Sequence, residues 1–129
     1  MVTGGYGVLG GSIAEGLAGA GARSELLGRN QEAAQARVEA LQAQGIEAIA
    51  LVADVLDEQD LKRTRDEVLA RWGRIDILIN AAGGNVARAR TDHTPVFAMP
   101  LDAFDEALRL NLHGTVYPSL LFGEAMADR

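Results

Sequence analysis

The chain has 129 residues and a formal net charge of −6, with 48% hydrophobic and 23% charged residues, which is typical of one folded domain over residues 1–129. The acidic balance argues against nucleic acid as a partner, because such partners require clustered lysine and arginine. The absence of cysteine excludes disulfides, zinc–thiolate sites and a thiol nucleophile. No uncharged apolar run reaches the roughly 20 residues that span a bilayer, so we expect no membrane partner and a cytoplasmic protein.

Short apolar runs alternate with amphipathic stretches along the first half of the chain. Residues 1–3 resemble the end of a strand, and a glycine-rich segment then leads into a helix predicted over residues 12–20. A second strand is predicted over residues 23–27. Asn30 is a suitable N-cap for the next helix, which we expect to run to about Gln44.

The second half continues this alternation. A third strand is predicted over residues 46–53, and Asp57 can cap a helix that reaches about Trp72. Residues 75–79 are the predicted fourth strand, and a long loop over residues 81–100 follows. The final helix carries more apolar side chains than one face of a sheet needs, namely Leu101, Phe104, Leu108, Leu112, Leu120, Leu121 and Phe122.

This alternation of strands and helices predicts a parallel sheet with helices on both faces. The strands read as continuous apolar runs because both of their faces are buried. Glu25 interrupts the second run, and we expect it at an edge or at a frayed position. The predicted fold class is α/β, a three-layer αβα, Rossmann-like, doubly wound parallel sheet that is incomplete, with about four strands.

The strongest chemical signal is the glycine-rich turn after the first strand. Gly5, Gly7 and Gly10 spell G-x-G-x-x-G between a strand and a helix, which is the context of a dinucleotide-binding turn. Glycine lets the backbone approach a pyrophosphate, and the helix N-terminus offers that anion unpaired N–H groups. The alternative is a purely structural glycine-rich helix entry.

The end of the second strand bears on which dinucleotide is bound. An acidic residue about 20 positions after the turn binds the ribose 2′-hydroxyl of NAD, but the segment from Gly28 to Asn30 contains no carboxylate. Arg29 instead puts a cation where the 2′-phosphate of NADP would lie, which favours NADP. The alternative is that Arg29 is a solvated loop residue.

Three further positions are candidates for chemistry. Asp54 follows the third strand and can accept a hydrogen bond from an adenine amino group, or serve only as a helix-entry residue. Asn80 can tie neighbouring strand ends together, and small residues after it let a flat ring lie against the backbone; the alternative is a plain turn. Asn111 and Gly114 are poor mid-helix residues, which predicts a local irregularity, or else a tolerated surface helix.

Together these features resemble the short-chain dehydrogenase/reductase family. The resemblance implies an enzyme that moves hydride between a nicotinamide and a secondary alcohol or carbonyl carbon, and that pairs into homo-oligomers through its final helix. It also implies cofactor-binding positions, which are Gly4, Gly5 and Gly10 at the pyrophosphate, Asp54 and Val55 at the adenine, and Asn80, Ala81 and Gly83 along the nicotinamide ribose. Asn111 matches the family's catalytic asparagine, which helps to hold a water in the proton relay.

The turn departs from the family pattern in one respect. Val8 stands where the family usually has its middle glycine, and Gly7, which we keep among the cofactor-binding residues, comes one place early. This variant turn, together with Gly83-Gly84-Asn85, is similar to the branch of sugar-acid oxidoreductases that act on fructuronate or mannonate.

A larger departure concerns catalysis. The family needs a serine and a Tyr-x-x-x-Lys pair, in which the lysine lowers the pKa of the tyrosine that acts as general acid and base. Neither Tyr6 nor Tyr117 has a lysine four residues later, and the only lysine is Lys62. We therefore expect the cofactor-binding part of an oxidoreductase, truncated at both ends and inactive alone. The alternative is a non-catalytic dinucleotide-binding or interaction module.

His93 and His113 are too few and too separated to indicate a metal site.

Overall fold

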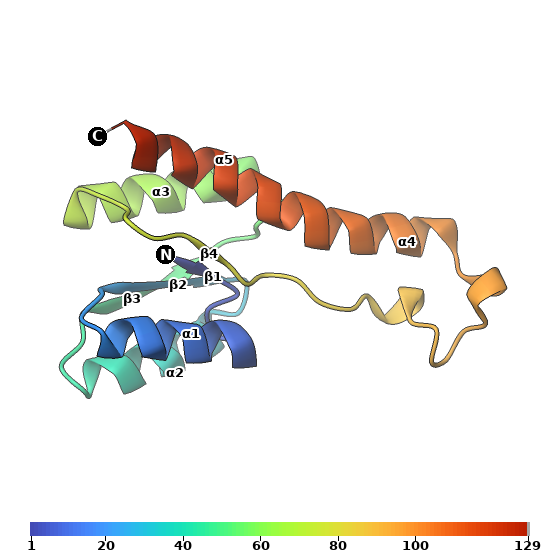
Figure 1. Ribbon diagram of the computed structural model, residues 1–129, viewed down its shortest axis with the longest axis horizontal. Coiled ribbons are helices and arrows are strands. Elements are labelled where there is room, and N and C mark those ends of the chain that lie inside the picture. Colours follow the sequence, from blue (N-terminus) through green and yellow to red (C-terminus); the bar gives the residue numbers. More distant parts are fainter. Residues whose placement is uncertain (129) are drawn as a thin grey trace.

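The computed structural model describes residues 1–128, and its centre is a four-stranded parallel sheet in the order β3-β2-β1-β4 (Figure 1). The strands are β1 (Val2–Thr3), β2 (Ser24–Gly28), β3 (Ala48–Val52) and β4 (Ile79–Asn80). The chain adds strands outward from β1 as far as β3 and then returns to the other side of β1. This reversal makes the sheet doubly wound, as the sequence predicts.

Helices cover both faces of the sheet, which confirms the three-layer αβα architecture. Figure 1 shows α1 (Val8–Gly19) and α2 (Gln31–Gln42) below the sheet, and α3 (Glu58–Trp72) and α5 (Gly114–Ala127) above it. Each face has its own apolar core. The lower core includes Val2, Leu26, Val38 and Leu41, and the upper one includes Leu27, Leu51, Leu61, Val68 and Phe122.

Local sequence signals fix most helix ends. The Asn30 side chain accepts a hydrogen bond from the Ala33 N–H at 3.0 Å, which caps α2. Asp57 caps α3 in the same way, and Gly73 ends it in the left-handed conformation, with φ of 76°. The start of α1 was not predicted correctly, because the helix begins at Val8 and so includes part of the glycine-rich segment.

The fourth strand is shorter than the predicted residues 75–79. Strand pairing with β1 is limited to Ile79 and Asn80 within the described residues, because β1 itself offers only two residues as partners. The Met1 ammonium group extends this contact by donating a hydrogen bond to the Ile77 carbonyl at 3.0 Å.

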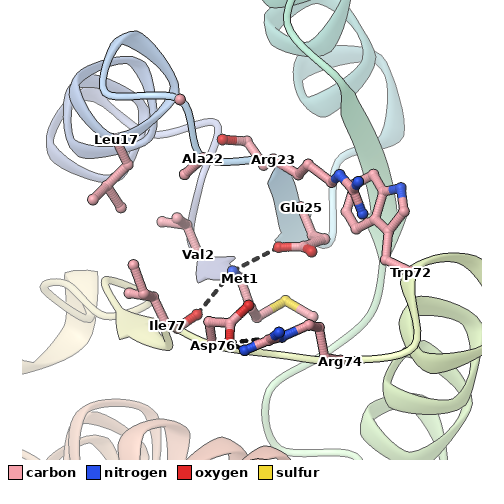
Figure 2. A pocket seen from close by; sticks show the side chains of 12 residues that line it. Met1, Val2, Leu17, Ala22, Arg23, Glu25, Trp72, Arg74, Asp76 and Ile77 are labelled. Atoms are coloured by element: carbon pink, nitrogen blue, oxygen red, sulfur yellow. Dashed lines mark hydrogen bonds and ion pairs between the residues drawn. The ribbon is translucent and has the colours of Figure 1, made fainter.

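Glu25 is not at an edge or frayed, so that expectation is wrong. It lies on β2, which has a neighbour on each side, and only 5% of its surface is exposed. Figure 2 shows its carboxylate beside the Met1 ammonium group, at 2.6 Å, in a pocket at the amino-terminal edge of the sheet. A buried carboxylate needs such a charged partner to offset the loss of its hydration.

The predicted final helix consists of three segments. These are α4 (Leu101–Leu108), a π-helical turn (Arg109–His113) and α5, which form one long rod that projects beyond the sheet (Figure 1). The irregularity predicted at Asn111 is confirmed, since this residue lies inside the π-helical turn. Before the rod, the predicted loop contains two short 3₁₀ turns, Ala87–Ala89 and Val96–Ala98.

Candidate dinucleotide-binding site

The carboxyl ends of all four parallel strands meet at one edge of the sheet, where they surround a pocket of about 200 Å³. Ligands of open parallel sheets bind at this edge, at the point where the strand order reverses. The reversal here falls between β1 and β4, and residues from both strand ends line the pocket. Its lining is Gly4, Tyr6, Gly7, Gly28, Arg29, Ala53, Asp54, Val55, Ala81, Ala82, Gly83 and Leu110.

Most of the candidate residues from the sequence therefore lie together. Gly4, Gly7, Arg29, Asp54, Val55, Ala81 and Gly83 line the pocket, whereas Gly5, Gly10, Asn80 and Asn111 are not among its lining residues. Gly5 packs against β2, where an added Cβ would come within 2.9 Å of the Leu26 side chain.

The turn after β1 is built from backbone in close contact. Gly4 has a φ of 63°, and a Cβ on it would lie 2.6 Å from the Ala81 carbonyl oxygen. A Cβ on Gly10 would overlap the Gly4 carbonyl oxygen. Glycine at these two positions thus lets the turn, the first turn of α1 and the end of β4 approach one another.

The N-terminus of α1 is chemically suited to a pyrophosphate. Its N-cap is Gly7, and within residues 1–128 no side chain caps the helix and no acidic residue lies in its first turn. The first N–H groups of a helix have no partner within it, and they carry the positive end of the helix dipole. Because Gly7 also lines the pocket, these donors lie beside a space that a diphosphate can fill.

Thr3 is a positioning residue to which the sequence analysis assigned no role. Its buried hydroxyl accepts hydrogen bonds from the Ala81 and Ala82 N–H groups, both at 3.2 Å, and so ties the end of β1 to the end of β4. The sequence predicts that Asn80 has this role, and this is wrong because Asn80 bonds to α5. Its Nδ2 donates to the Ser119 hydroxyl at 2.9 Å, and its buried Oδ1 has no partner within the described chain.

Asn111 holds the loop after β4 from the opposite side. Its Oδ1 accepts from the Gly84 N–H at 3.0 Å, and its Nδ2 donates to the carbonyl oxygens of Gly84 and Ala107, each at 2.9 Å. A Cβ on Gly83 would lie 2.8 Å from Asn111 Oδ1, so glycine is needed for this approach. The side chain of Asn111 is therefore a positioning group here, and its match to a catalytic asparagine stays a prediction.

Asp54 shapes the entry to α3 and lines the pocket, while its contact with an adenine amino group stays a prediction. One carboxylate oxygen accepts from the Leu56 N–H at 2.9 Å, which shapes the entry to α3, while the residue also lines the pocket. The Asp54 N–H donates to Asp60 at 3.1 Å. Hydrogen bonds from the Arg63 guanidinium and from this N–H hold the pKa of Asp60 below its ordinary value.

Arg29 is an exposed cation at the mouth of the pocket. It makes no ion pair or hydrogen bond with any residue of the described range, and it borders three adjoining recesses. The arginines of the long loop differ from it, because Arg88 pairs with Asp102 and Arg90 pairs with Asp92. The Arg29 guanidinium is thus available to an anion, whereas those of Arg88 and Arg90 are engaged.

Residues 1–128 contain neither a metal-binding cluster nor a membrane-spanning helix. No group of three or more histidine, aspartate or glutamate side chains there is arranged to hold a metal ion. No helix in that range is both long and apolar enough to cross a membrane.

Comparisons with known proteins agree with this geometry. A family model described as short chain dehydrogenase matches residues 1–129. An uncharacterized oxidoreductase of Bacillus subtilis (strain 168), UxuB, is 36% identical over 135 residues, which cover 98% of this chain and 49% of that protein.

Solved structures resemble the chain closely as well. A protein assigned as a D-mannonate oxidoreductase from Haemophilus influenza, with bound NAD, aligns with a TM-score of 0.89 and 30% identity, over 96% of this chain and 48% of the other. A metagenomic short-chain oxidoreductase in complex with NADP aligns with a TM-score of 0.83 and 29% identity, over 96% of this chain and 54% of the other. The chain spans about half the length of the relatives it matches.

The close contact at Gly10 leads to a prediction about stability. Gly10→Ala forces a methyl group into the Gly4 carbonyl oxygen and should lower the free energy of unfolding by about 1–3 kcal/mol. Gly16→Ala is a matched control on the same helix, because an added Cβ there meets nothing within 4 Å. It should raise the free energy by about 0.5–1 kcal/mol. Denaturant unfolding measures both, and a Gly10→Ala variant as stable as Gly16→Ala would contradict the proposed contact.

Proposed function

This chain belongs to the short-chain dehydrogenase family, and we propose on that premise that it binds NAD or NADP at the carboxyl edge of its sheet as part of an oxidoreductase. The observation that carries the proposal is the backbone cradle formed by Gly4, Gly10 and the uncapped start of α1. A cradle of this kind excludes side chains from the space that a pyrophosphate needs.

Each part of the pocket has a proposed task in holding the cofactor. The N–H groups at the start of α1 bind the pyrophosphate, and the free carboxylate oxygen of Asp54 accepts from the adenine amino group, with Val55 beside it. Asn80, Ala81 and Gly83 lie along the nicotinamide ribose. The nicotinamide, when bound, supplies or accepts a hydride; Thr3 and Asn111 keep the loop that faces it in place.

The proposed substrate is a secondary alcohol or the corresponding carbonyl compound, in the form of a sugar acid. This finer proposal is supported by the likeness to the protein assigned as a D-mannonate oxidoreductase and by the Gly83-Gly84-Asn85 segment.

A non-catalytic dinucleotide-binding module is the second candidate. It applies to these 129 residues taken by themselves, because neither Tyr6 nor Tyr117 has a lysine four residues later in this sequence. Both candidates require the same cofactor site, and they differ in whether hydride transfer takes place.

Arg29 generates the prediction about cofactor choice. Arg29→Ala should weaken NADP binding by roughly 10- to 100-fold, because a charge-assisted hydrogen bond contributes about 1.5–3 kcal/mol. NAD has no 2′-phosphate, so its affinity should change much less. Calorimetric titration of both cofactors measures the difference, with Arg71→Ala on α3 as a control that leaves both affinities unchanged. An equal loss for NAD and NADP on Arg29→Ala would exclude the role.

The same chain should show no turnover by itself. Without the Tyr-x-x-x-Lys pair, no group in this sequence takes the proton of the alcohol as that pair does. Purified 129-residue protein, mixed with NAD or NADP and mannonate, should leave the absorbance of the reduced nicotinamide unchanged. Sustained reduction of the cofactor by rigorously purified protein would show that other residues can perform the step.

We also propose that a second copy of the chain packs on the α4–α5 rod. One stripe of the rod has apolar residues three or four positions apart, with exposed fractions from 40% to 83%: Leu101, Phe104, Leu108, Leu112, Val116 and Leu120. Two copies can pair such stripes symmetrically without any charge complementarity. Phe122 is excluded from this surface because it is fully buried in the upper core.

Light scattering tests this pairing. At tens of micromolar the protein should be a dimer or a larger oligomer, and Leu120→Glu should shift it toward monomer because it puts a charge into the apolar contact. Gln59→Ala, on an exposed part of α3, is the control and should leave the mass unchanged. A wild-type chain that is a stable monomer would contradict the proposal.

A further inference from the structure

Tyr6 and Gly28 form a fitted pair at the mouth of the pocket. A Cβ on Gly28 would overlap Cε1 of the Tyr6 ring and would lie 2.5 Å from Cδ1 and 2.9 Å from Cζ. The backbone of Gly28 does not itself require glycine, because its φ lies outside the left-handed region. Glycine is needed at this position because the tyrosine ring occupies the space of a side chain.

The pair joins two neighbouring strand ends. Gly28 is the buried last residue of β2, and Tyr6 lies in the turn that follows β1, which pairs with β2. Tyr6 is half-buried and forms a wall between the site pocket and a shallow recess at the start of α2, which Arg29 also borders. Within residues 1–128 the Tyr6 hydroxyl makes no hydrogen bond, so it is free to serve a ligand.

The position of this wall indicates which part of the ligand it meets. In dinucleotide sites of this architecture, the residue at the end of β2 contacts the ribose 2′-position of the adenosine. In this chain β2 ends in Gly28, and the phenol ring of Tyr6 occupies the space that a side chain at this position would fill. The ring is neutral, so it does not repel a 2′-phosphate as a carboxylate would, and its hydroxyl can donate to a phosphate oxygen.

We propose that Tyr6, seated on Gly28, is a specificity-determining residue that contacts the adenosine 2′-position and, together with Arg29, favours a 2′-phosphorylated dinucleotide. The proposal rests on the proposed cofactor site. It assigns to an aromatic side chain from the glycine-rich turn a task that a side chain of β2 would otherwise have.

Two small probes isolate the 2′-position. Adenosine 2′,5′-bisphosphate carries the 2′-phosphate and 5′-AMP does not, and calorimetry on the full chain gives the affinity of each. Tyr6→Phe keeps the ring on Gly28 and removes only the hydroxyl. It should weaken binding of the bisphosphate roughly tenfold, since a charge-assisted hydrogen bond is lost, and should weaken binding of 5′-AMP less than threefold. An unchanged ratio of the two affinities would overturn the proposal.

A double-mutant cycle tests the seating of the ring. Gly28→Ala should displace the ring and lower the bisphosphate affinity by at least the loss seen with Tyr6→Phe. In a Tyr6→Ala background the space is empty, so the same substitution should leave the affinity unchanged. Additive losses would overturn the pairing of the two residues. If Gly28→Ala prevents folding, recovery of the fold in the Tyr6→Ala background, followed by circular dichroism, reports the same steric coupling.

The wild-type chain separates this proposal from the one on which it rests. If the wild type binds NAD and NADP but Tyr6→Phe leaves the ratio of the bisphosphate and 5′-AMP affinities unchanged, the role of Tyr6 is overturned and the cofactor site is retained. Failure of the wild type to bind NAD, NADP or either probe overturns both.

Discussion

The contact between the backbone of Gly4 and the first turn of α1 is the constraint on which the rest of the site depends. The Gly4 carbonyl lies where a side chain on Gly10 would start, and Gly4 itself packs on the Ala81 carbonyl. These approaches bring together the end of β1, the start of α1 and the end of β4, three segments that side chains would keep apart. They leave the start of α1 beside the pocket, where seven of the twelve lining residues are glycine or alanine.

Side chains then hold this main-chain surface in place from two directions. The Thr3 hydroxyl, at the end of β1, bonds to the first residues after β4. Asn111, in the π-helical turn, bonds to the N–H and carbonyl groups of Gly84. The π-helical turn places the Asn111 amide so that it reaches both the loop and the Ala107 carbonyl. The loop after β4 is thus held by hydrogen bonds on both of its sides.

Features set by neighbours in sequence could be predicted, and features set by distant contacts could not. The caps at Asn30 and Asp57, the glycine that ends α3 and the irregularity at Asn111 each follow from residues within one or two turns. The length of β4 depends instead on how many residues β1 offers it, 76 or more positions away in the chain. Glu25 is buried beside the Met1 ammonium group, a neighbour that it gains only in the folded chain. The hydrogen bond from Asn80 to Ser119 and the contact between Tyr6 and Gly28 likewise form only in the folded chain.

Amide NMR spectra of the isotope-labelled chain, recorded while NAD or NADP is added, test most directly whether the carboxyl edge of the sheet is the binding site. We expect the largest shifts at the start of α1, at Val8, Leu9 and Gly10, with further shifts at Asp54 and in the loop after β4. The pocket at the opposite edge, around Glu25 and Trp72, should remain unperturbed (Figure 2). Shifts confined to that opposite pocket, or no shifts with either cofactor, would contradict the assignment.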